Sequence, residues 1–99
     1  MVYEIARITV KDGAGAAFED GAKKAVPLFQ RAKGCLGMRI ERSIEEPLNY
    51  TLIVEWETVE DHMVHFRNSA DFQEWRALVG PSFASPPQVH HTEVVLEGF

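Results

Sequence analysis

The feature that most constrains the fold is the segment 49–79, which predicts a strand that leads directly into an amphipathic helix. Four apolar residues alternate with more polar ones at its start: Tyr50, Leu52, Val54 and Trp56. Because successive strand residues point to opposite faces, these four form one apolar face. Thr58 ends the strand and can cap the following helix by accepting from the amide of Asp61. We therefore expect any site to lie between this strand and this helix.

The helix of this segment is predicted as two consecutive pieces. The first piece has an apolar face that carries Val59, His62, Met63 and Phe66, at helical spacings of three and four. Asn68 and Ser69 interrupt the pattern, and Ser69 or Asp71 supplies a new capping residue. In the second piece the same stripe continues through Phe72, Trp75, Arg76 and Val79. Gly80 and Pro81 end it, because proline cannot continue a helix.

The rest of the chain predicts three more strands and one more helix. The strands cover residues 2–10, 35–43 and 88–96, with a turn at 11–13 and a hairpin loop at 43–48. The helix begins at Ala14, and Pro27 predicts a bend or an early end near Val26. Apolar residues gather on one face of the first two strands: Ala6, Ile8 and Val10, then Leu36, Met38 and Ile40.

This order of elements, β-α-β-β-α-β, predicts a ferredoxin-like α+β fold, in which a four-stranded antiparallel sheet carries both helices on one face. The opposite face mixes two apolar residues with polar and charged ones: Ile5 and Ile53, with Arg7, Arg39, Glu41, Thr51, Glu55 and Glu93. Such a face is too apolar for ordinary solvent-exposed surface. It suits a wet homodimer interface with Arg–Glu pairs, and two sheets packed face to face would form a dimeric α+β barrel.

Length, charge and composition restrict the number of domains, the classes of binding partner and the cellular compartment. Ninety-nine residues predict one domain, 1–99. The formal net charge of -5 argues against a nucleic-acid partner. No apolar run approaches the ~20 residues that cross a bilayer, and no secretory signal follows Met1. The one cysteine, Cys35, excludes an internal disulfide and fits a reducing compartment. We expect a cytoplasmic protein without a membrane partner.

Several motifs together resemble those of a known family: Gly34-Cys35-Leu36-Gly37, Glu45-Glu46-Pro47, EWETVEDH at 55–62, Phe66-Arg67-Asn68-Ser69 and Phe72-Gln73-Glu74-Trp75. Over nearly its whole length the chain resembles the antibiotic biosynthesis monooxygenase family of dimeric α+β barrels. That family includes cofactor-free monooxygenases that oxidise anthrone-like polyketides to quinones, haem-degrading enzymes and a signal-molecule isomerase. The resemblance implies an oxidoreductase of the monooxygenase type without metal or flavin.

The resemblance also implies site residues. In the polyketide branch a strand tryptophan is followed by a tyrosine six residues later and an arginine twenty residues later. Here those three positions are Trp56, His62 and Arg76, while Leu52 stands where the branch has asparagine. The positions that carry asparagine and tryptophan in the haem-degrading branch hold Ala6 and His65, so haem degradation is not expected.

His62 is the main catalytic candidate. Its place on the apolar stripe directs it toward the face of Leu52, Val54 and Trp56, where burial would keep the imidazole neutral at pH 7. A neutral imidazole can act as a general base on an acidic phenol or enol. The alternative interpretation is a core histidine bonded to the backbone or to a tyrosine.

Trp56 and Arg76 complete the predicted catalytic set, and the remaining candidates would bind the substrate. Trp56 and Trp75 can line a flat apolar pocket or simply pack in the core. Arg76 can hold an anionic intermediate, or pair on the surface with Glu74 or Asp71. The remaining predicted wall residues are Met38, Leu52, Phe66 and Phe72.

The sequence favours no metal or nucleotide cofactor. His62, His65, His90 and His91 do not show a closed ligand set, which a metal site needs. Gly13-Ala14-Gly15 is too short to indicate a nucleotide. Three functions therefore stay open on the same pocket: a monooxygenase of a small aromatic or quinol-like substrate, a non-catalytic ligand-binding or stress-related module, and an isomerase or lyase of an enolisable metabolite.

Overall fold

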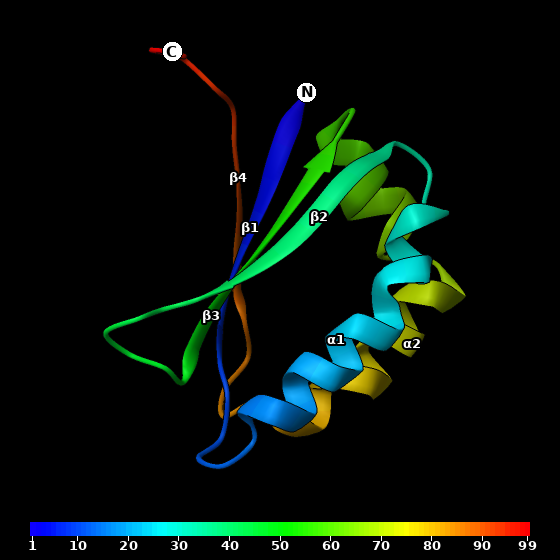
Figure 1. The fold of residues 1–99 in the computed structure, drawn as a ribbon. Coiled ribbons are helices and arrows are strands. Elements are labelled where there is room, and N and C mark those ends of the chain that lie inside the picture. The colour runs from blue at the N-terminus through cyan, green and yellow to red at the C-terminus, as the bar shows by residue number, and fades with distance from the viewer.

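The computed structural model describes all 99 residues. Its elements follow the predicted order: β1 (Val2–Thr9), α1 (Gly15–Gln30), β2 (Cys35–Arg42), β3 (Asn49–Trp56), a π-helix (Asp61–Phe66), α2 (Ala70–Val79), a 3-10 turn (Gly80–Ser82) and β4 (Gln88–Thr92). The strands form one antiparallel sheet in the order β2-β3-β1-β4. Both long helices lie on the same side of this sheet (Figure 1). The ferredoxin-like α+β prediction is confirmed.

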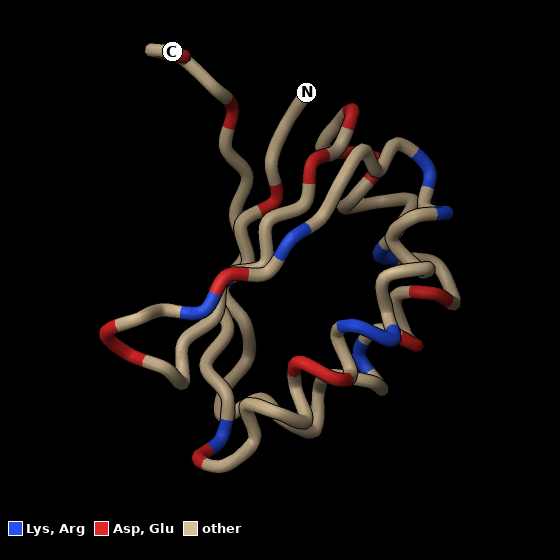
Figure 2. The backbone as a smooth tube through the Cα atoms, viewed as in Figure 1, with Lys and Arg blue, Asp and Glu red and all other residues tan.

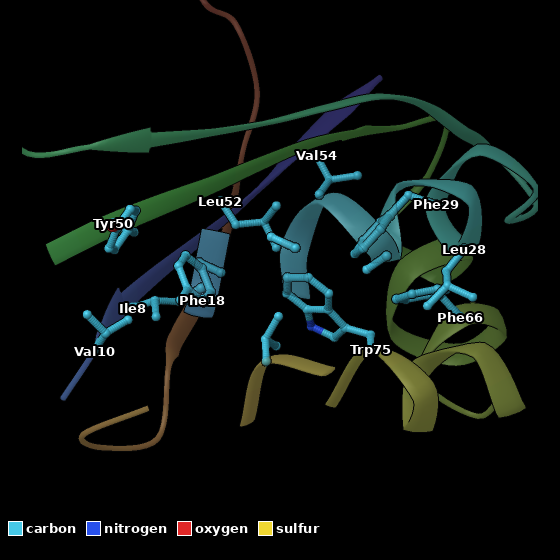
Figure 3. Close-up of a cluster of buried hydrophobic side chains, with 14 of the residues drawn as sticks. Ile8, Val10, Phe18, Leu28, Phe29, Tyr50, Leu52, Val54, Phe66 and Trp75 are labelled. Atoms are coloured by element: carbon cyan, nitrogen blue, oxygen red, sulfur yellow. The ribbon is translucent and has the colours of Figure 1, made fainter. Parts of the chain in front are cut away.

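The core fills the space between the sheet and the two helices. The predicted face of β3 is buried, with Leu52 and Val54 at most 2% exposed. In Figure 3 these side chains extend from the sheet toward Phe29 of α1 and Trp75 of α2. Phe29 lies edge-on to Trp75, with ring centroids 5.2 Å apart. The aromatic residues of the two helices therefore meet the aliphatic face of the sheet, and this burial is the main stabilising term.

Pro27 does not end α1 early, contrary to one of the predicted alternatives. The helix continues to Gln30 although proline supplies no amide hydrogen. Leu28 and Phe29, which follow the proline, are 4% and 1% exposed. Their burial holds the last turn in helical form despite the lost hydrogen bond. The turn after the helix then reverses at Gly34, whose φ of +76° favours glycine.

Three strand predictions are corrected. The last strand ends at Thr92 rather than at residue 96, because Thr92 pairs with Tyr3 and β1 offers only one more residue beyond that point. In β2 a bulge between Cys35 and Gly37 shifts the register, so that Leu36 is 48% exposed instead of sharing the apolar face with Met38. The first strand also ends one residue early, and Val10 forms an isolated bridge with Phe83.

The predicted pair of helical pieces is present, with both capping contacts. Thr58 Oγ1 accepts from the amide of Asp61 at 3.1 Å, and Ser69 Oγ accepts from the amide of Phe72 at 3.2 Å. The first piece is a π-helix, whose wider turn changes which residues face inward. His62 is buried there, whereas Met63, predicted on the same face, is 38% exposed.

Charged residues lie mainly outside the core. Figure 2 shows both acidic residues and lysines along α1, and acidic residues at the hairpin between β2 and β3. On the sheet face away from the helices, Ile5 and Ile53 are opposite each other and half-buried. None of the helices combines the length and the apolar character that crossing a membrane would require.

Candidate functional site

A cavity of about 570 Å³ opens between the sheet and the second helical segment. This volume is within the range of small-molecule sites. Half of its lining residues are apolar and half are polar or charged, and in Figure 3 the apolar side chains of Leu52 and Trp75 extend into the interior from opposite layers. Sixteen residues line it: Glu4, Ala6, Ile8, Leu52, His62, Met63, Arg67, Asn68, Phe72, Gln73, Trp75, Arg76, Phe83, Pro86, Pro87 and Val89.

Two buried ionisable groups meet in the wall of this cavity. Glu4 lies on the inward face of β1, and His62 is carried by the π-helix; they are 5% and 2% exposed. His62 Nε2 lies 3.2 Å from Glu4 Oε1. The same oxygen accepts a hydrogen bond of 3.1 Å from Trp56 Nε1. The buried carboxyl thus accepts a hydrogen bond from an indole N–H, which satisfies it, and lies beside an imidazole nitrogen.

His62 is fixed on its other sides as well. Its ring stacks on that of Trp56, with centroids 5.4 Å apart and planes 17° from parallel. Its Nδ1 lies 2.8 Å from Nε2 of His91. His91 is on β4 directly opposite Glu4 of β1, so the sheet register places the carboxyl and the second imidazole side by side. The two ring nitrogens of His62 therefore contact different residues.

Burial shifts the pKa values of Glu4 and His62 in opposite directions. Loss of water raises the pKa of Glu4 to about 7, although the Trp56 hydrogen bond and the positive charge of Arg67 oppose this shift. Loss of water also lowers the pKa of His62 to about 4, with further lowering by His91 and Arg67. At neutral pH the imidazole is uncharged, and the carboxyl is the group that gains or loses a proton.

The cationic residues of the cavity lie along α2 and the turn before it. Arg67 and Arg76 both line the cavity, and their guanidinium carbons are 5.5 Å and 6.0 Å from the Phe72 ring centroid. Asp71, a suggested surface partner of Arg76, instead pairs with Arg31 at 2.7 Å. Arg76 is therefore available to the cavity, and an anion there would meet positive charge beside an aromatic wall.

The structure brings only some of the predicted site residues to this cavity. Leu52, His62, Phe72, Trp75 and Arg76 line it. Trp56 and Phe66 lie behind the wall, buried and 5.5 Å apart between ring centroids. Met38 does not reach it: this side chain lines a separate groove of about 500 Å³ between α1 and β2.

Three residues of the site were not predicted to belong to it from the sequence: Glu4, Arg67 and His91. Glu4 could have been found, since strict alternation places it on the same face as Ala6 and Ile8. The position of His91 next to Glu4 depends on the register of β4 against β1, which cannot be predicted from a local sequence pattern. No three of the His, Cys, Asp and Glu side chains are grouped so as to hold a metal ion.

Known proteins share this architecture. The antibiotic biosynthesis monooxygenase family matches residues 1–78, a range that includes β1, the π-helix, most of α2 and the Glu4–His62 pair. The chain belongs to the antibiotic biosynthesis monooxygenase family. The resemblance found in the sequence motifs is confirmed.

Relatives support this membership over almost the whole chain. A Bordetella bronchiseptica protein, whose crystal structure is described as that of a putative antibiotic biosynthesis monooxygenase, is 61% identical, covering 96% of this chain and 97% of that one, with a TM-score of 0.95. YczJ of Bacillus subtilis (strain 168), an uncharacterized protein, is 39% identical over 96% of this chain and its own full length.

A cofactor-independent oxygenase has the same fold. SnoaB from Streptomyces nogalater matches with a TM-score of 0.85 at 18% identity, covering 98% of this chain and 95% of SnoaB. At that identity the likeness concerns the fold, and a fold can host unrelated reactions. The activity of this family member has to be argued from its own cavity.

Proposed function

We propose that this family member is a cofactor-independent monooxygenase that acts on a small aromatic or quinol-like molecule. The observation that carries the proposal is the buried Glu4–His62 pair in the wall of a cavity of about 570 Å³ that combines apolar and polar lining residues. Family membership supports an oxygenase, and the pair supplies the base that such chemistry needs. The fit of a flat ligand is supported by the aromatic walls Phe72 and Trp75.

The chemistry requires an acidic C–H or O–H bond next to an aromatic ring. The buried base removes the proton, and the electron pair stays on the substrate as a carbanion or enolate. Arg76 stabilises that negative charge from the cavity wall. Molecular oxygen then reacts with the carbanion, and the bound substrate itself displaces water from the cavity. His62 is part of the base in this proposal, and Trp56 holds it in place by stacking.

No metal or flavin is required in this scheme, since the substrate itself provides the electrons that reduce oxygen.

We also propose that the protein acts in the cytoplasm, because its one cysteine, Cys35, is a free thiol. Fractionation of source cells that placed the protein outside the cytoplasm would contradict this.

Incubation with an anthrone-type substrate, which carries a CH₂ group between its aromatic rings, under ¹⁸O₂ tests the activity. We expect the protein to consume oxygen and to place one ¹⁸O atom in the quinone product. A metal chelator should not lower the rate of oxygen consumption. Rearrangement of the substrate under nitrogen would instead indicate an isomerase or lyase. A rise in melting temperature without turnover would indicate a binding module. Either result would overturn the oxygenase proposal.

We propose further that two chains form a homodimer through the outer sheet face. Ile5 and Ile53 lie side by side there without a covering layer, and Arg39 and Glu41 form a 3.0 Å ion pair next to them. Sedimentation equilibrium should give twice the chain mass of 11.2 kDa, and Ile53→Lys should shift it toward the single chain. A wild-type protein that sediments as one chain at micromolar concentration would contradict the interface.

A further inference from the structure

We propose that Glu4 is the catalytic base of the cavity, acting through its Oε2 oxygen, and that His91 is a positioning residue which sets the tautomer of His62. This inference rests on the proposed oxygenase function and assigns roles within the same site. It is independent of the family motifs, since Glu4 and His91 are outside the residues that carried the resemblance.

The two oxygens of Glu4 have different surroundings. Oε1 is occupied: it accepts from Trp56 Nε1 at 3.1 Å and lies 3.2 Å from His62 Nε2. Oε2 has no donor within the protein, yet no fully buried side-chain oxygen is left without a hydrogen-bond partner. Oε2 must therefore reach space accessible to water. The cavity is the space that Glu4 lines, so Oε2 is the atom offered to a bound molecule.

The protons on the two imidazoles follow from their neighbours. An uncharged imidazole carries one N–H and one acceptor nitrogen. His62 Nε2 lies beside Oε1, which already serves as an acceptor for Trp56, and a carboxylate oxygen repels a lone pair. This favours the tautomer in which His62 Nε2 carries the hydrogen. His62 Nδ1 then has to accept, and the neighbour at 2.8 Å is His91 Nε2, which donates.

The charge of the pair resides on the carboxyl. His62 cannot easily take the proton itself, since burial lowers its pKa to about 4. The carboxyl, with a pKa raised to about 7, exchanges a proton near neutral pH, where a general base is most effective. Arg67 acts on the pKa values of all three groups, Glu4, His62 and His91. His91 also lowers the pKa of His62, His90 lowers that of His91, and Glu4 in turn raises the pKa of Cys35.

The reaction balances with oxygen as the only co-reactant. Glu4 Oε2 takes a proton from a CH₂ group of the substrate, the C–H electron pair remains as a carbanion, and molecular oxygen adds to give a peroxide anion. Glu4 returns its proton to the peroxide, and loss of water from the hydroperoxide leaves a carbonyl. One O₂ oxidises CH₂ to C=O and gives one water, so that Glu4 is restored without an external proton donor.

Variants at position 4 test the assigned base. We expect Glu4→Gln to lower kcat by about 10²–10⁴-fold with little change in KM, since the amide keeps the shape but cannot take the proton. Glu4→Asp should retain part of the rate. Glu4→Ala should recover activity when formate is added, because this small carboxylate can occupy the vacated space, whereas formate should not rescue Arg76→Ala. Full activity of Glu4→Gln would overturn the assignment.

Neighbouring histidines of β4 test the positioning role. His91→Ala should lower kcat about 10-fold, as the loss of an orienting partner typically does. His90→Ala is the matched control, since His90 is exposed and lies opposite Ile5 on the other sheet face. In ¹⁵N-imidazole NMR, His62 should show Nε2–H in the wild type and in His90→Ala, and a mixture of tautomers in His91→Ala. An unchanged His62 spectrum in His91→Ala would overturn the role.

The two proposals can fail separately. A wild-type protein that consumes no oxygen, but whose Glu4 carboxyl titrates near pH 7 and whose His62 tautomer depends on His91, would overturn the oxygenase function and the catalytic role of Glu4, and leave the positioning role of His91. An active wild type in which Glu4→Gln is equally active would overturn only the role of Glu4.

Discussion

Replacement of His62 by alanine is expected to lower kcat/KM for anthrone-dependent oxygen consumption by about 10²–10⁴-fold, because the proposed base Glu4 then loses the imidazole that holds its carboxyl in place. His62 stacks on Trp56 and contacts Glu4 Oε1 at 3.2 Å, so its removal leaves the carboxyl without one of its two neighbours. The carboxyl would then rotate away from its working position. The loss should appear in steady-state oxygen-electrode rates.

The matched control for this change is His65→Ala. His65 belongs to the same π-helix, but it is exposed and its Nε2 lies 3.4 Å from Lys33 Nζ, away from the cavity. We expect His65→Ala to retain the wild-type rate. Because a buried histidine can also matter for folding, His62→Gln and the melting curves of all variants should accompany the assay. A well-folded His62→Ala protein with wild-type kcat/KM would remove His62 from the site.

The second large effect is on stability and depends on pH. Glu4→Gln should gain stability relative to the wild type by about 2 to 3 kcal/mol between pH 5 and pH 8.5. The pKa of Glu4 is about 7 in the folded protein against an ordinary value of 4.5. Its protonated form therefore stabilises the fold fully below 4.5, and this contribution is lost as the pH rises through 7. Glutamine is a neutral isostere and carries no such loss.

His62 acts with the opposite sign, which is why the variant must be compared with the wild type at each pH. Its folded pKa of about 4 lies below the ordinary 6.5, so its contribution is present above 6.5 and lost as the pH falls toward 4. Urea unfolding at several pH values measures the difference. Glu57→Gln, an exposed carboxyl just after β3, reports the effect of removing one surface charge. A Glu4→Gln difference that does not change with pH would contradict the buried, proton-sharing environment.

Several features of this protein follow from local patterns. Alternation in β3 places Leu52 and Val54 inward because side-chain direction has a period of two, and the structure buries both. Thr58 and Ser69 are caps because a helix start leaves amides without acceptors, and both make the expected contacts. The position of His62 on the inward side was also predictable, since it precedes buried Phe66 by one helical turn.

Other features were decided by contacts between distant segments. The bulge at Leu36 and the early end of β4 depend on register against a neighbouring strand, which the chain cannot report locally. The exposure of Met63 follows from a π-helical turn, in which the inward positions no longer repeat at α-helical spacing. Met38 was predicted in the site but faces a groove on the other side of the core.

The sequence by itself thus determined the ferredoxin-like order of elements and the histidine at the cavity, because periodicity and capping act between residues near in the chain. The family was indicated by the resemblance of its motifs. Only the tertiary structure decided what surrounds that histidine. Glu4 and His91 are 87 residues apart, and their meeting requires β1 and β4 to pair with one particular register. Burial shifts the pKa values of these residues, and burial exists only once the distant segments have packed together in the core.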